Sequence, residues 1–124
     1  MNTGALHLVS GQDERVLLGQ VWRTATAWER LRGLFALPPL HSGQALLIEP
    51  CNSIHTLGMR YALDLAFIDR QGSIRKLVRH CRPWRFVMAL NSHATLEMSA
   101  GEIARCGLQT GMRVRWQANQ KESI

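Results

Sequence analysis

The sequence predicts a mainly β protein with a compact, jelly-roll-like or barrel-like sheet core. Short apolar runs recur along the chain with glycine, proline or aspartate between them, a pattern typical of β-sandwiches and small barrels. A single stretch combines helical spacing of apolar residues with a capping signal. A parallel α/β fold would need a crossover helix between successive strands, and the chain shows no such alternation.

Composition predicts one globular domain. The chain has 124 residues, of which 46% are hydrophobic and 19% charged, as in ordinary globular proteins. No apolar run approaches the roughly 18 residues of a membrane span, and no signal-peptide pattern is found at the start. Three cysteines without paired spacing indicate reduced thiols. We therefore expect a single domain over residues 1–124, a cytoplasmic location and no membrane partner.

One α-helix is predicted near residues 27–36. Thr26 and Glu29 have the spacing of a capping box, in which a hydroxyl and a carboxylate satisfy the first free amides of a helix. Leucines at helical spacing follow. Pro38 and Pro39 should end the helix, because proline cannot continue its hydrogen-bond ladder and restricts the preceding residue.

The other apolar runs predict strands. Asp69 to Gly72 is a turn signal, so the runs on either side should pair as a hairpin. Residues 101–107 can hold a short helical turn, and residues 117–124 are predicted to be a frayed tail. The predicted strands are residues 16–22 with 6–9 beside them, 44–49, 62–68, 73–78, 94–98 and 112–116, and residues 84–91 should form a short strand or an extended loop.

Polar and sulfur side chains concentrate in the connection over residues 51–60, which reads Cys-Asn-Ser-Ile-His-Thr-Leu-Gly-Met-Arg. Pro50 ends one predicted strand and Ala62 begins the next, so this connection should cross the end of the sheet. Loops held by rigid strands often carry sites, and polar groups there need partners, water or a ligand. We expect one cleft that Trp84 and Arg85 close from the side, faced by Ser53, His55, Thr56, Arg60 and Asp64.

The preferred interpretation is a binding site for a small anionic ligand or a partner. Hydroxyls and an imidazole can exchange hydrogen bonds, and guanidinium groups can hold a carboxylate or phosphate. Asp64 and Glu97 would orient those cations or fix the loop, and Asp64 and Thr56 could instead only satisfy loop amides. The candidate ligand-binding residues are Ser53, His55, Thr56, Met59, Arg60, Asp64, Trp84 and Arg85.

Two alternatives depend on Cys51 and His55. A reactive thiol at Cys51 would need His55 as base and Asp64 to orient it, but the spacing does not establish contact. A metal site would need three or four ligands, and neither Cys-x-x-Cys nor His-x-x-x-His spacing occurs. We therefore assign no catalytic residue, no metal and no cofactor. The further metal candidates near these two residues are His80, Cys81 and Cys106.

The net charge of +6 comes mainly from arginine, which supplies 13 of the 15 cations. Arginine favours planar contacts with carboxylates and phosphates. Weak nucleic-acid binding is a third alternative, ranked below ligand binding because clustered cations with interleaved aromatics occur at few places. Those places are Arg79, Arg82, Trp84, Arg85 and Phe86, and the basic face of Arg113 and Arg115 on the last predicted strand.

Several short motifs occur in a specific order. They are Arg30-Leu31-Arg32-Gly33-Leu34, Ile54 to Met59, Leu63 to Asp69, Pro83-Trp84-Arg85, Leu96 to Gly101 and Gly107 to Gly111. Together they cover roughly residues 16 to 116, and the chain resembles the conserved bacterial and archaeal family called domain of unknown function one hundred and ninety-two. The resemblance implies a compact, mostly β domain with a jelly-roll-like or barrel-like core, and it implies no activity.

Overall fold

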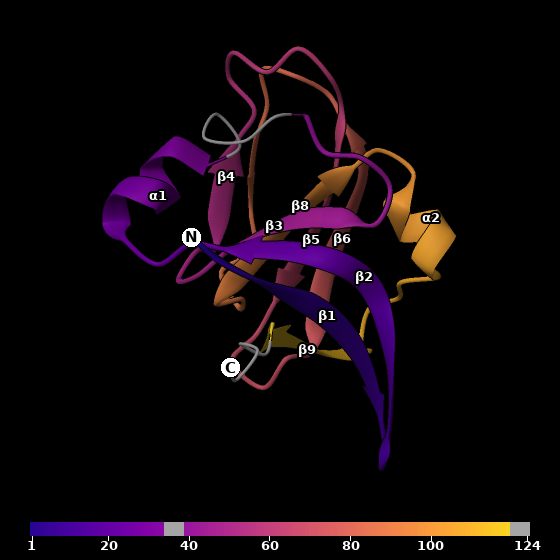
Figure 1. Ribbon diagram of the computed structural model, residues 1–124. Helices are drawn as coiled ribbons and strands as arrows, with labels where there is room; N and C mark the ends of the chain where they lie inside the picture. The colour runs from indigo at the N-terminus through magenta and orange to yellow at the C-terminus, as the bar shows by residue number, and fades with distance from the viewer. Residues whose placement is uncertain (34–38, 120–124) are drawn as a thin grey trace.

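The computed structural model describes residues 1–33 and 39–119, and within them the chain is mainly β, as predicted (Figure 1). The mainly β class is confirmed, with a sandwich-like core. The elements are β1 (Asn2–Ser10), β2 (Asp13–Arg23), α1 (Ala27–Arg32), β3 (Gln44–Ile48), β4 (Ser53–His55), β5 (Leu63–Ile68), β6 (Ile74–Cys81), β7 (Phe86–Met88), β8 (Ala94–Ser99), α2 (Glu102–Cys106) and β9 (Arg113–Ala118).

Seven strands form one coiled sheet in the order β6-β5-β8-β3-β2-β1-β9. The β2–β3 pair is parallel and the other pairs are antiparallel. The two edges meet at one end, where Ser73 and Arg113 form a β-bridge and Val114 N donates to Gly72 O at 2.8 Å. A Cβ at position 72 would lie 2.5 Å from Val114 O, so glycine permits this approach. The sheet is therefore barrel-like in its coiling without being a closed barrel.

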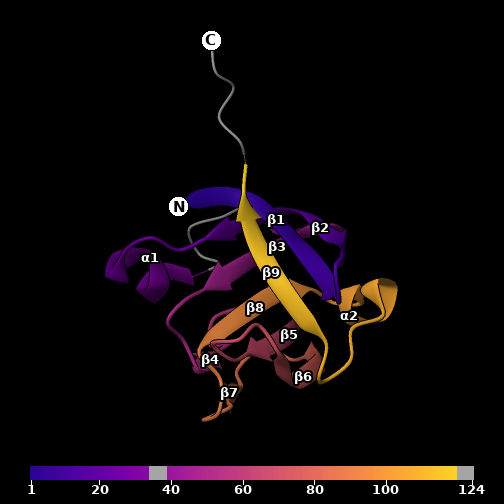
Figure 2. The same cartoon turned by 90° about the horizontal axis from the view of Figure 1, so that it is seen from below.

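Both faces of the central strands β3, β5 and β8 are covered. Inside the coil, a first apolar cluster packs against α2. On the outer face, a second cluster packs under the small two-stranded sheet of β4 and β7. Figure 2 shows these two strands outside the coiled sheet. Alternate apolar residues of β3 and β5 enter different clusters, and β5 is buried along its whole length. The inner cluster includes Leu18, Ala66, Leu96 and Ile103, and the outer cluster includes Leu46, Ile54, Leu63 and Phe67.

Helix α1 begins where the capping box predicts. Thr26 Oγ1 accepts from Glu29 N at 3.1 Å, and the Glu29 carboxylate accepts from Thr26 N at 3.2 Å. The helix ends at Arg32, followed by Gly33 at a φ of 52°. Positions 34–36 of the predicted helix and Pro38 lie outside the described residues.

The hairpin of β5 and β6, the strand over residues 94–98 and the helical turn at α2 are confirmed. Two boundaries differ from prediction. β1 and β2 form a longer hairpin than expected, with nine and eleven residues. β9 continues to Ala118, which pairs with Gly4, and Asn119 N donates to Thr3 O at 3.0 Å. The beginning of the predicted frayed tail is therefore paired in the sheet, and residues 120–124 lie outside the described part. No described helix has the length and apolar character needed to cross a membrane.

Candidate functional site

The connection over residues 51–60 is not an open loop. Its residues 53–55 form β4, in which Ser53 pairs with Met88 and His55 with Phe86 of β7. Ile54, between them, turns inward and is buried in the outer cluster. The connection lies outside the ladder of the main sheet, as predicted. The sequence did not indicate that residues 53–55 would pair with residues 86–88, more than thirty positions away, in a separate two-stranded sheet.

Thr56 is a buried structural residue rather than a free ligand contact. Its Oγ1 donates to Arg82 O at 2.8 Å and accepts from Arg85 N at 2.8 Å. Its own amide donates to Arg85 O, and its carbonyl accepts from Trp84 N at 3.0 Å. Trp84 has a φ of 63°, which is uncommon for a residue with a side chain. Thr56 thus fixes the strained turn over residues 82–85.

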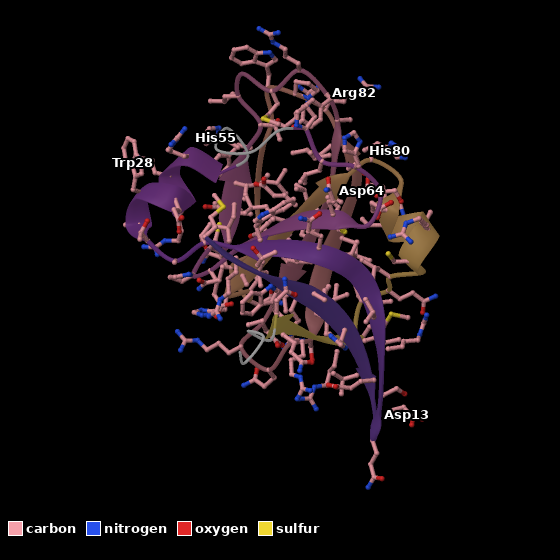
Figure 3. All side chains as sticks on the ribbon, viewed as in Figure 1. Asp13, Trp28, His55, Asp64, His80 and Arg82 are labelled. Carbon is pink, nitrogen blue, oxygen red and sulfur yellow. The ribbon has the colours of Figure 1, made fainter. Side chains whose placement is uncertain are left out.

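Asp64 is also structural, and it faces the inside of the coil. Its carboxylate accepts from His80 N at 2.9 Å, Gly101 N at 3.0 Å and Ile103 N at 2.9 Å. The first amide belongs to a bulge of β6, where His80 has a φ of 51°, and the others begin α2. The expectation that donors come from Arg60 and the loop is wrong. Figure 3 shows Asp64 near α2 and His55 near α1.

A cavity of about 190 Å³ lies between the end of α1, β4 and the outer face of the main sheet. Only part of the predicted site lines this cavity, so the predicted residues do not share one cleft. Among the described lining residues are Ile48, Ile54 and Leu63 as an apolar wall, and Arg30 and Arg32 from α1. Of the predicted residues, Cys51, Ser53, His55 and Met59 line this cavity, whereas Thr56, Arg60, Asp64, Trp84 and Arg85 do not.

Glu97 of β8 lines the same cavity and is only 6% exposed. It lies between Leu46 of β3 and Leu65 of β5. Within the described part of the chain its carboxyl group has no hydrogen bond or ion pair. Burial raises the pKa of Glu97 from 4.5 to about 7, because an apolar environment disfavours the charged form.

Sequence reasoning gave Glu97 only a supporting role. The alternation of residues 94–98 suggested a strand with one polar face, and polar faces are usually solvated. The informative signal was the apolar runs of β3 and β5, which indicate strands buried on both faces. A glutamate between such strands has to be buried as well.

The described residues are not arranged as the Cys51–His55 enzyme or the metal site would require. The Cys51 thiol donates to Ser53 O at 3.0 Å, and Asp64 is engaged by amides on the opposite face, so Cys51, His55 and Asp64 are not assembled as a triad. Burial raises the pKa of the Cys81 thiol, which disfavours a reactive thiolate. Across residues 1–33 and 39–119, no three His, Cys, Asp or Glu side chains are placed to hold a metal ion.

Comparison with known proteins identifies the fold and a family. The family model DUF192, described as Uncharacterized ACR, matches residues 8–116. A protein of unknown function from Novosphingobium aromaticivorans is similar in structure, with 19% identity, a TM-score of 0.73, and coverage of 92% of this chain and 85% of that one.

A proposed transcription regulator from Sinorhizobium meliloti is also similar, with 19% identity, a TM-score of 0.77, and coverage of 92% and 93% of the two chains. No curated protein matches the sequence significantly. At this identity the two structures show a shared fold alone.

Proposed function

The chain belongs to the DUF192 family, and from its geometry we propose that it binds a small molecule in the cavity beneath α1. The observation that carries this proposal is Glu97. A carboxyl group buried without a partner costs folding free energy. A ligand in the cavity that Glu97 lines would supply the partner that this carboxyl group lacks among the described residues.

The lining indicates a ligand with two polar ends and an apolar body. Arg30 and Arg32 come from the last turn of α1 and suit a carboxylate or phosphate. Glu97 suits an ammonium, because an opposite charge favours its ionised form. Aliphatic side chains such as Ile48 and Leu63 line the same cavity. The arginine end agrees with the anionic ligand expected from sequence, and Glu97 adds a requirement for a cationic group.

The cavity volume limits the size of the ligand. At about 190 Å³ it is smaller than the roughly 300–1,000 Å³ of sites for drug-sized molecules. An amino-acid-like zwitterion with a short aliphatic side chain fits the size and both poles. Other titratable groups near Glu97 are His55 and Cys51 in the lining. Tyr61 and Cys81 are also close, because burial and the charge of Glu97 raise the pKa of each.

Three probes with similar aliphatic chains test the proposal: norvaline as a zwitterion, butyrate as an anion and butylamine as a cation. We expect norvaline to shift the backbone NMR signals of Ile48, Ile54 and Leu63 at lower concentration than either single-charge probe. Glu97→Gln should weaken norvaline and butylamine binding without affecting butyrate, because the amide keeps the shape and removes the charge.

Glu14→Gln is the matched control, since it makes the same change at the far hairpin, where Glu14 pairs with Arg115. It should bind all three probes like the wild type. Signals around the cavity that do not move with any probe, or norvaline binding that Glu97→Gln leaves unchanged, would contradict the proposal.

A further inference from the structure

Four large apolar side chains project from one short segment. They are Trp84, Phe86, Met88 and Leu90, here called the β7 stripe, and they are 65%, 65%, 44% and 78% exposed. The residues between Phe86 and Leu90 that turn inward are smaller: Val87 and Ala89 pack on the outer cluster. The strand alternates as expected, but its larger apolar residues face outward. Exposed apolar side chains grouped in this way mark interaction surfaces.

The fold holds the β7 stripe in place. β7 pairs with β4, and Ala89 N donates to Asn52 O at 2.9 Å. At the other end, Thr56 fixes the turn that carries Trp84. Figure 2 shows β7 at the margin of the molecule, outside the coiled sheet. Leu57, 48% exposed, follows Thr56 and adds apolar surface at this end.

The surroundings of the stripe are strongly basic. No aspartate or glutamate occurs over residues 70–96. Arg82 and Arg85 are exposed in the turn beside Trp84, and Lys76 Nζ donates to Met88 O at 2.9 Å. A partner must therefore accept apolar side chains and carry negative charge close by. The six cations of this segment are Arg70, Arg75, Lys76, Arg79, Arg82 and Arg85.

We propose that the β7 stripe docks onto the surface of an anionic lipid bilayer. Tryptophan and phenylalanine favour the boundary between acyl chains and headgroups, and arginines beside them attract anionic headgroups. A bilayer meets both requirements without a shaped groove. A second copy of the chain would bring arginine against arginine, and bases cannot stack on the aliphatic half of the stripe, Met88 and Leu90.

This contact differs from a membrane span. The expectation of no membrane partner rested on the absence of a long apolar run, which concerns spanning segments. Surface binding requires only a few apolar side chains and nearby cations, and the joint exposure of the four stripe residues is a property of the fold.

Vesicle co-sedimentation of the full chain tests the proposal. Wild type should bind vesicles of equal parts phosphatidylcholine and phosphatidylserine, and this binding should weaken with added salt. Phosphatidylcholine vesicles should bind little. Phe86→Ser with Leu90→Ser, and separately Arg82→Gln with Arg85→Gln, should each weaken binding about tenfold or more.

Matched controls test whether the location of the substituted residues matters, and not only the number of apolar groups or cations removed. Val16→Ser with Trp28→Ser removes exposed apolar groups elsewhere, and Arg15→Gln with Arg113→Gln removes two exposed cations elsewhere. Both should bind like the wild type. Thermal melting checks that every variant is folded, which is expected because all eight positions are exposed.

Tryptophan emission gives a second readout. Anionic vesicles should shift the wild-type emission to shorter wavelength, and Trp84→Phe should lose this shift while Trp28→Phe retains it. The proposal is overturned if the wild-type protein does not bind anionic vesicles. In that case, retention of the chain on polyglutamate or on single-stranded DNA would identify a protein or a nucleic acid as the anionic partner. Equal vesicle binding by the Phe86→Ser, Leu90→Ser variant also overturns it.

Discussion

Asp64 of β5 and Glu97 of β8 are buried carboxyl groups on opposite faces of one sheet, and their surroundings differ completely. Asp64 is 1% exposed and accepts three backbone hydrogen bonds. Glu97 is 6% exposed and has no polar partner in the described part of the chain. Three amides offset the desolvation of Asp64, whereas Glu97 is left with a raised pKa. Burial alone therefore does not separate a structural carboxylate from a candidate ligand group; the number of partners does.

The cause of the difference is what covers each face. The inner face at Asp64 meets the start of α2 and a bulge of β6, and both leave amides free. The outer face at Glu97 meets β4 and apolar side chains. Among the described residues no amide of β4 donates to Glu97, and β4 pairs with β7. Three substitutions test this comparison, taken from the largest expected effect to the smallest.

Asp64→Ala should destabilise the protein by about 3–5 kcal/mol, because three backbone amides lose a charged acceptor and one of them, Ile103 N, is buried. Urea denaturation measures the change. Asp13→Ala is the control, since Asp13 is exposed at the tip of the β1–β2 hairpin (Figure 3) and its loss should change stability by less than about 0.5 kcal/mol. If Asp64→Ala unfolds at the wild-type urea concentration, the three amides do not stabilise the fold as argued.

Glu97→Gln should make the protein more stable above about pH 7, by up to about 3 kcal/mol at 1.36 kcal/mol per pKa unit. The folded pKa is about 7 and the ordinary value is 4.5. Below pH 4.5 both states are protonated and the variants should be equal. As pH rises to 7, the unfolded chain releases its proton first, so the wild type loses stability.

Denaturation at several pH values gives the difference between Glu97→Gln and the wild type. It should grow over this window and then level off. Glu14→Gln, at an exposed position, is the matched control and should not reproduce that growth. A difference that shrinks as pH rises would mean that Glu97 is stabilised as a carboxylate by a partner.

Thr56→Val should cost about 1–2 kcal/mol, because Arg82 O and Arg85 N lose their hydroxyl partner. The neighbouring exposed His55→Asn should fold normally, with a change below about 0.5 kcal/mol. Thermal melting of both variants separates a satisfied buried group from an exposed one. Equal melting temperatures of the two variants would mean that the hydrogen bonds of the Thr56 hydroxyl do not stabilise the fold as those of Asp64 do.

Local signals predicted local structure well. The capping box of α1 uses residues three positions apart, and the turn of the β5–β6 hairpin is set by Asp69, whose carboxylate accepts from Gln71 N and Ser73 N. Interactions over such short separations depend on few conformational choices. The mainly β class followed in the same way from strand periodicity and turn residues.

The sequence by itself therefore determined the class of fold, its main hairpin, the start of its first helix and the stretch in which polar chemistry concentrates. The tertiary structure alone decided which of those groups are free. Two partners of Asp64 lie 37 and 39 positions away, and Glu97 lines one cavity with the end of α1. A residue's own neighbours in sequence do not specify which distant backbone will cover it, because strand order and the side on which α1, β4 and α2 pack are set by burial of the whole chain.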